Sequence, residues 1–297
     1  MLAGSIVALV TPMHRSGEVD WPALDRLIDW HLESGTHGIV PMGTTGESAT
    51  LNVDEHIKVI ERTVARVAKR VPVIAGTGAN ATAEAIEWTR AAARAGADAC
   101  LLVTPYYNKP TQEGLYQHYK AIAAAVDIPQ VLYNVPWRTA CDMKAETVGR
   151  LAVIDNIIGI KEACGDIHRV TEIRQRCPAD FIVLSGEDAQ TLDMLKLGAV
   201  GTISVTANVL PREMAEFVSA YLEGDEARAR SIDGRLQPIH QILFVETSPQ
   251  PVKWALHLMG RIDTGIRLPL LPMSEIHRPE LERRLREVGA FKCFATE

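Results

Sequence analysis

Long hydrophobic runs, blocks of like charge and paired cysteines are all missing from this chain of 297 residues. No run approaches the roughly 20 apolar residues of a membrane-spanning helix, and the apolar first ten residues lack the basic start and small-residue cleavage site of a signal peptide. The net charge of −6 is spread along the chain, whereas nucleic acids and anionic membranes bind clustered Lys and Arg. We therefore expect a small-molecule substrate, with neither a nucleic acid nor a membrane as partner.

Cysteine and histidine usage also excludes several site types. The five cysteines are odd in number and contain no Cys-X-X-Cys pair; they are Cys100, Cys141, Cys164, Cys177 and Cys293. This usage is typical of reduced thiols in the cytoplasm. The nine histidines show no spacing of the kind that metal sites use, so we expect no metal.

Short runs rich in Val, Ile, Leu and Ala alternate with stretches of helical length up to about residue 224. The predicted strands are 5–11, 38–42, 72–75, 99–104, 130–133, 157–161, 181–185 and 201–204. Two of the predicted helices span 54–69, with apolar residues at helical spacing, and 83–95, which is rich in alanine. Eight βα units predict an α/β fold, namely a (β/α)₈ TIM barrel.

The strand pattern stops after Gly224. Helical segments are predicted at 225–236, 251–258 and 280–288. We therefore predict a barrel catalytic domain over residues 1–224 and a C-terminal helical domain over residues 225–297. Packing and assembly are the simplest roles for this extension, and a lid is the alternative.

Lys161 ends the apolar run 157–161, which reads as a strand of a parallel sheet buried on both faces. Burial disfavours the charged form of an amine, and a neutral lysine amine is a nucleophile toward a carbonyl carbon. The other interpretation is a lysine that reaches solvent or pairs with Glu162. The residues after the other strands decide between the two.

In such a barrel the active site lies at the carboxyl ends of the strands, so the polar residues just past each run belong together. Segment 43–48 (Gly-Thr-Thr-Gly-Glu-Ser) offers N–H and hydroxyl donors that suit a carboxylate, or it forms an ordinary turn with Ser48 or Asn52 capping the next helix. Tyr106, Tyr107 and Tyr133 follow other strands and are core or rim residues, or proton carriers for imine formation. Arg138 holds a loop or clamps a second carboxylate.

Together these segments resemble the dihydrodipicolinate synthase family of pyruvate-dependent class I aldolases over nearly the whole length. The segments that carry the resemblance are 43–48, 73–78, 103–110, 133–136, 159–163 and 251–254. The resemblance implies that Lys161 forms an imine with pyruvate, and that the derived enamine attacks L-aspartate 4-semialdehyde to give 4-hydroxy-tetrahydrodipicolinate on the route to diaminopimelate and lysine. No cofactor and no metal are implied.

The resemblance also implies a role for each site residue. Tyr133 would move protons, linked through Thr44 to Tyr107 of a neighbouring subunit, and Thr45 with Thr44 would hold the pyruvate carboxylate. Gly186 and Ile203 would line the same pocket, while Arg138 would meet the carboxylate of the second substrate. A shared site of this kind implies a homo-oligomer, expected to be a tetramer built as a dimer of dimers.

A lysine effector site is implied at a dimer interface, at positions matching Ser48, Ala49, His56, Asn80, Glu84 and Tyr106. Val53 replaces a histidine common in lysine-sensitive relatives, which predicts weak or absent inhibition. Trp137 stands where the family usually has glycine and would shift the Arg138 loop. Ser248 and Gln250 also depart from the commoner family pattern.

Two other functions fit part of this pattern. A related aldolase, such as an N-acetylneuraminate lyase or a hydroxy-oxoglutarate aldolase, would keep the lysine and tyrosine but take another aldehyde. A catalytically silent barrel would only bind a keto acid. Arg138 and the Thr44-Thr45 pair favour the synthase, and the intact Lys161, Tyr133, Thr44 and Tyr107 argue against a silent barrel.

Overall fold

The apolar runs of the sequence form parallel strands in the computed structural model, which describes residues 2–291. Within that range there are eight strands, each close to its predicted place: β1 (Gly4–Ala8), β2 (Gly38–Val40), β3 (Ile74–Gly76), β4 (Ala99–Val103), β5 (Gln130–Asn134), β6 (Ile157–Glu162), β7 (Ile182–Ser185) and β8 (Gly201–Ser204). The first strand is shorter than predicted, because the N–H of Val10 donates to Oδ1 of Asn208 at 3.1 Å instead of to a neighbouring strand.

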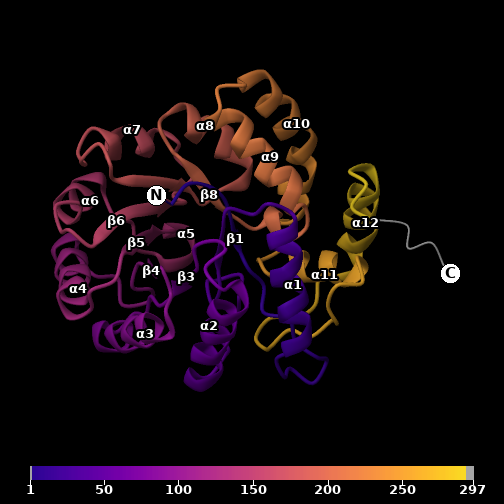
Figure 1. Ribbon diagram of the computed structural model, residues 1–297, viewed down its shortest axis with the longest axis horizontal. Helices are drawn as coiled ribbons and strands as arrows, with labels where there is room; N and C mark the ends of the chain where they lie inside the picture. The colour runs from indigo at the N-terminus through magenta and orange to yellow at the C-terminus, as the bar shows by residue number, and fades with distance from the viewer. Residues whose placement is uncertain (1, 292–297) are drawn as a thin grey trace.

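The strands close into a ring. Their order is β2-β1-β8-β7-β6-β5-β4-β3, and a bridge between Ile39 and Val73 joins the two ends of this series. Helices surround the ring (Figure 1), so the predicted TIM barrel is confirmed.

The helices of the barrel follow the strands in alternation. They are α1 (Trp21–Glu33), α2 (Val53–Val67), α3 (Thr82–Ala95), α4 (Gln112–Ala125), α5 (Pro136–Thr139), α6 (Ala145–Leu151), α7 (His168–Arg174), α8 (Thr191–Lys196) and α9 (Pro211–Leu222). At the start of α2, Asn52 accepts from the N–H of Glu55 and the Glu55 carboxylate accepts from the N–H of Asn52. This capping box fixes where helix α2 begins after segment 43–48, which contains Thr44 and Thr45.

Two apolar layers hold the barrel together. The inner layer fills the ring with side chains such as Ile6, Val40, Ile74, Leu101 and Leu184. The outer layer lies between the strands and the helices. Alternate residues of each strand therefore face opposite layers, which decides what each side chain near Lys161 can reach.

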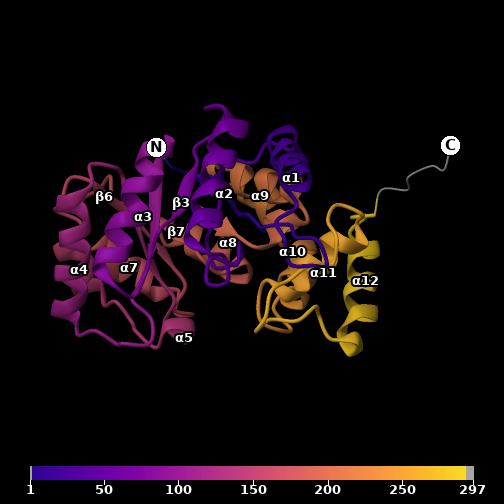
Figure 2. The same cartoon turned by 90° about the horizontal axis from the view of Figure 1, so that it is seen from below.

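The C-terminal segment forms α10 (Glu226–Ile242), α11 (Gln250–Leu258) and α12 (Arg278–Glu287). Figures 1 and 2 show α11 and α12 at one side of the barrel. The helix predicted over 225–236 continues through Pro238, since Ile239 and Ile242 are buried and their packing extends it. Among the described helices none has the length and apolarity to cross a membrane.

Cys100, Cys141, Cys164 and Cys177 are free thiols, and Cys293 lies outside the described residues.

Candidate active site

Lys161 lies at the carboxyl end of β6 and is only 5% exposed. Tyr133 is its partner in register on the adjacent strand β5. The Nζ atom of Lys161 lies 4.3 Å from the centre of the Tyr133 ring. The amine therefore sits inside the mouth of the barrel beside a phenol, and the alternative of a lysine that reaches solvent is wrong.

Burial is the main influence on this amine. It lowers the pKa of Lys161 to about 8, because the charged form loses its hydration. The negative charges of Asp188 and Glu187 oppose this change, and the positive charge of Arg138 adds to it. Near neutral pH a useful fraction of the amine is unprotonated and can act as a nucleophile.

The Tyr133 hydroxyl is held in its protonated form. Burial raises its pKa to about 12, while the positive charge of Arg138 and a hydrogen bond with Thr44 act in the opposite direction. A neutral phenol that is hydrogen-bonded to a threonine hydroxyl can give a proton to an oxygen formed near Lys161 and later take one back.

Thr44 and Thr45 lie in a tight turn after β2. The N–H of Gly46 donates to the carbonyl of Gly43 at 3.0 Å, and the N–H of Glu47 donates to the carbonyl of Thr44 at 3.1 Å. The hydroxyl of Thr11 donates to the carbonyl of Gly46 at 2.7 Å. The segment therefore forms a hydrogen-bonded turn that also carries hydroxyl and N–H donors. The residue that caps helix α2 is Asn52 and not Ser48.

A small cavity of about 30 Å³ opens between these residues. Its wall includes Thr44, Thr45, Tyr133, Arg138, Lys161, Gly186, Glu187, Phe244 and Ser248. Gly186 has no room for a side chain, because a Cβ atom there would lie 2.9 Å from Cε of Lys161 and 2.7 Å from Cβ of Ala163. The hydroxyl, amine and guanidinium groups on this wall suit a small acid.

Arg138 lies at the mouth of this cavity. Its Nη2 atom donates to the carbonyl of Ser248 at 3.3 Å, and its guanidinium lies 4.3 Å from the centre of the Trp137 ring. Burial lowers the pKa of Arg138. Trp137 is 58% exposed, so this unusual residue stacks on the arginine and leaves Arg138 on the cavity wall.

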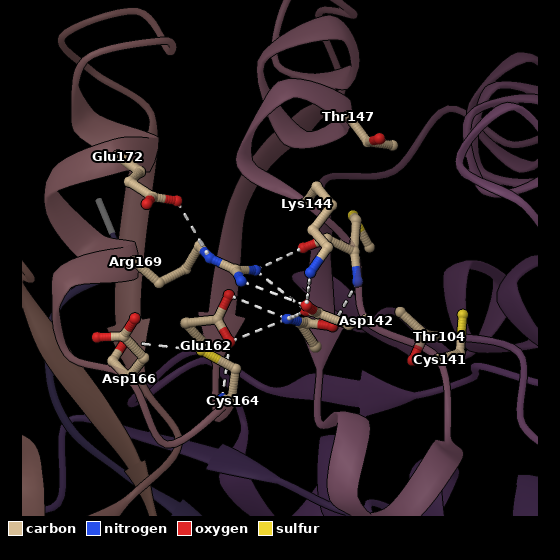
Figure 3. A network of polar contacts seen from close by, with 12 residues as sticks. Thr104, Cys141, Asp142, Lys144, Thr147, Glu162, Cys164, Asp166, Arg169 and Glu172 are labelled. Carbon is tan, nitrogen blue, oxygen red and sulfur yellow. Dashed lines mark hydrogen bonds and ion pairs between the residues drawn. The ribbon is translucent and has the colours of Figure 1, made fainter.

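The residues that follow Tyr133 and Lys161 face the opposite side of their strands, where a polar network surrounds Glu162 and Asp142 (Figure 3). The next residues, Asn134 and Glu162, are also paired in register, and Nδ2 of Asn134 donates to Oε1 of Glu162 at 3.0 Å. The same nitrogen donates to Asp142, which also pairs with Arg169 at 3.0 Å. Among the described residues Glu162 is hydrogen-bonded to Asn134 and to the N–H of Cys164, and it forms no ion pair with Lys161. Burial raises its pKa to about 7.

Two predicted site residues do not line the cavity of this chain. Tyr107 is 90% exposed with a φ of 75°, so it projects away from the barrel. Ile203 is buried in the inner layer with Tyr133. The role of Tyr107 in a neighbouring subunit stays a prediction.

The residues of the predicted effector site are brought together only in part. Nδ2 of Asn80 donates to the carbonyl of Tyr106 at 3.3 Å. Burial raises the pKa of Tyr106, and the negative charge of Glu84 adds to this increase. His56 is buried, and its Nε2 atom lies 2.8 Å from the carbonyl oxygen of Gly76. Ser48 is half-buried and Ala49 exposed, next to the threonine turn.

The sequence alone missed several residues of this site. Glu187 and Asp188 follow β7, and the sequence does not predict their electrostatic effect on Lys161. Phe244 and Ser248 come from the C-terminal segment and complete the cavity wall. No local pattern marks them, because only the packing of that segment on the barrel brings them to Lys161.

Comparison with known proteins agrees with this geometry. A model of the dihydrodipicolinate synthetase family matches residues 1–288. A 4-hydroxy-tetrahydrodipicolinate synthase of Alcanivorax borkumensis is 60% identical over 97% of this chain and 98% of its own length. A dihydrodipicolinate synthase of Acinetobacter baumannii, solved with pyruvate, is 53% identical with a TM-score of 0.96 over 98% of this chain and 100% of that one.

The dihydrodipicolinate synthase of Cyanidioschyzon merolae, solved with lysine bound, is 38% identical with a TM-score of 0.94 over 97% of this chain and 98% of that one. A family match over almost the whole chain and relatives of this identity leave one assignment. The chain belongs to the dihydrodipicolinate synthetase family.

Proposed function

We propose that this chain condenses pyruvate with L-aspartate 4-semialdehyde to give 4-hydroxy-tetrahydrodipicolinate, as a lyase of the class I aldolase type. One observation carries the proposal: a buried Lys161 amine with a lowered pKa lies against the ring of Tyr133, in a cavity that Thr44 and Thr45 also line. The names of its relatives favour this reaction over the reaction of a sugar-acid lyase, and they favour an enzyme over a catalytically silent barrel.

The first step is imine formation. The neutral amine of Lys161 adds to the keto carbon of pyruvate, and the carbinolamine oxygen takes a proton and leaves as water. Tyr133 is the proton donor beside the amine, and its hydrogen bond with Thr44 gives the proton a path onward. Thr44 and Thr45 hold the pyruvate carboxylate through hydroxyl and N–H donors.

The second step forms the carbon–carbon bond. Loss of a methyl proton turns the imine into an enamine, whose terminal carbon attacks the aldehyde carbon of the second substrate. The amine of that substrate then displaces Lys161 from the former keto carbon and closes the ring. Two substrates thus give one cyclic product and one water, and the lysine is free again.

Arg138 meets the carboxylate of L-aspartate 4-semialdehyde. It lies on the cavity wall, fixed between the carbonyl of Ser248 and the ring of Trp137, so its donors are already oriented. Gly186 leaves the space that the Lys161 side chain needs, and Ile203 supports the cavity from the inner layer.

The active unit is a homo-oligomer, a tetramer built as a dimer of dimers. The exposed Tyr107 side chain, held on a backbone of positive φ, supports a role in which it completes the proton path at Thr44 of a neighbouring copy. The enzyme works in the cytoplasm, and the catalytic barrel ends at residue 224, with residues 225–297 forming the second domain.

L-Lysine acts as an effector at the cluster of Ser48, Ala49, His56, Asn80, Glu84 and Tyr106. The contact between Asn80 and Tyr106 supports this site. His56 is already committed to Gly76 and Val53 lacks a polar group, which favours weak inhibition. Rates measured over a range of free L-lysine test this part separately: a saturable decrease supports it, and no decrease up to millimolar concentrations removes it.

Trapping with borohydride tests the imine. Reduction in the presence of pyruvate should add the mass of a reduced pyruvate imine to the peptide that contains Lys161, and Tyr133→Phe should slow this trapping by about 10²-fold or more. A coupled reductase assay with both substrates should then show turnover. An unmodified Lys161 contradicts the mechanism, whereas cleavage of only longer sugar acids would assign the chain to the sialic acid lyases.

A further inference from the structure

The segment 251–254 matches the family, yet the reaction described above uses none of it. Lys253, in α11, is 5% exposed and lies among the buried residues Val252, Ala255 and Leu256. Its Nζ atom forms an ion pair with Oε1 of Glu47. A lysine on the apolar side of a helix is costly to bury, so its charge serves a contact with the barrel and not solubility.

Glu47 is unusual in backbone and in side chain. Its φ is 59°, a left-handed conformation that a glutamate adopts only at a cost of about 1 kcal/mol or more. Its side chain has no exposed surface. Oε2 accepts from the N–H of Arg267 at 3.1 Å, so each carboxylate oxygen is bound by a residue of the C-terminal segment.

The position of Glu47 links this contact to the chemistry. It lies three residues after Thr44, and its own N–H donates to the Thr44 carbonyl at 3.1 Å. The Gly46 carbonyl is fixed from the other side by the Thr11 hydroxyl at 2.7 Å. Thr11 of the barrel therefore holds the turn that contains Thr44 and Thr45 at Gly46, and the C-terminal segment holds the next residue, Glu47.

We propose that Lys253 and Glu47 are positioning residues, and that their buried ion pair fixes the Thr44-Thr45 turn in the shape that binds the keto-acid carboxylate. The inference rests on the proposed function. It gives the C-terminal helices a task in pyruvate binding besides completing the cavity wall, and it explains why segment 251–254 carries a lysine on its buried side.

Steady-state kinetics of Lys253→Met test this directly. The KM for pyruvate should rise by about tenfold or more, because a loosened turn loses well-oriented donors, while kcat falls by less than about threefold. Lys253→Arg keeps a donor for Glu47 and should recover most of the loss. Glu47→Gln keeps one of the two acceptor oxygens and removes the charge, and it provides a milder second variant in case the methionine variant does not fold.

Glu280→Gln is the matched control. Glu280 pairs with the side chain of Arg283 within α12 at 2.6 Å, so this variant removes an ion pair of the same C-terminal segment without touching Glu47 or its partner Arg267. Its KM for pyruvate should stay within about twofold of the wild-type value. A KM equally changed in Glu280→Gln and Lys253→Met, or unchanged in Glu47→Gln and Lys253→Met, would overturn the proposal.

Borohydride trapping with pyruvate separates this inference from the proposed function. At saturating pyruvate the Lys253→Met protein should still form the adduct on Lys161, with half-saturation at a higher pyruvate concentration than in the wild type. If the wild-type protein forms no adduct, the proposed function itself fails. If both form it with the same half-saturation, only the positioning role fails.

Discussion

Two buried lysines of this chain differ in their nearest neighbours. Lys161 at the barrel mouth and Lys253 in the C-terminal helix α11 are each 5% exposed, and burial lowers the pKa of both. Lys253 forms a direct ion pair with Glu47. Glu187 and Asp188 act on Lys161 only through space, and its close contact is the neutral ring of Tyr133.

This difference decides what each amine can do. A partner carboxylate favours the ammonium form, which has no lone pair and works as a structural charge. Without such a partner, burial leaves the amine neutral part of the time and nucleophilic. Residue type and burial alone therefore do not identify a catalytic lysine, and the nature of its nearest neighbour does.

The largest contrast is expected in catalysis. Lys161→Met should lower turnover by on the order of 10⁴-fold or more and abolish the borohydride adduct with pyruvate, since no other amine can replace a covalent catalyst. Lys253→Met should still form the adduct. Intact-protein mass after reduction measures both, and an adduct of undiminished yield in the Lys161 variant would break the comparison.

Stability should change in opposite directions in the same two variants. The pKa of Lys161 is about 8 in the folded protein against a reference value of 10.5, so this amine binds its proton less tightly in the folded protein than in the unfolded chain. Lys161→Met should therefore raise the free energy of unfolding by about 3 kcal/mol at pH 7. Lys253→Met leaves Glu47 buried without its partner and should lower it by about 3–5 kcal/mol.

Denaturant unfolding of both variants at several pH values measures this contrast. The cost of Lys161 is fully present below pH 8 and fades as the pH rises toward 10.5, so the gain in Lys161→Met should shrink over that window. A gain that stayed constant up to pH 10.5 would show that packing, and not the lowered pKa, is responsible.

Sequence patterns predicted the barrel because each strand is a local signal. Runs such as 157–161 are continuously apolar, and parallel strands buried on both faces require that composition. The same logic located Lys161 and Tyr133 at strand ends, and register then placed them side by side. Local sequence patterns thus predict which groups are reactive and that they are buried at the ends of strands.

Long-range contacts were out of reach of the same reasoning. The role of Glu47 depends on Lys253 and Arg267, which only tertiary packing brings to it. The effect of Asp188 on Lys161 depends on the orientation of a side chain past the end of β7. Trp137 stacks on Arg138, which lies on the cavity wall, and the shift of the Arg138 loop relative to the family stays a prediction.

The pH dependence of imine formation sharpens the account of the unpaired lysine. With a pKa of about 8, the neutral fraction of Lys161 falls tenfold for each pH unit below that value. The kcat/KM for pyruvate should therefore fall by about 50-fold between pH 8 and pH 6 and rise by only about twofold above pH 8. A flat profile over this range would show that deprotonation of this amine does not limit the reaction.

The smallest expected effect comes from the charge near Lys161. Asp188 raises the pKa of Lys161, so Asp188→Asn should move the midpoint of the pH profile to lower pH by less than about one unit and raise kcat/KM below it by a few-fold. Oδ2 of Asp188 accepts from the N–H groups of Val205 and Thr206, and an asparagine oxygen can still accept there.

Asp193→Asn is the control. Asp193 is an exposed carboxylate that pairs with Lys196, and its replacement should leave the midpoint unchanged. A midpoint that moved to higher pH in Asp188→Asn would mean that the carboxylate acts on the reaction through hydrogen bonding, and that the contrast between the two lysines is not electrostatic in origin.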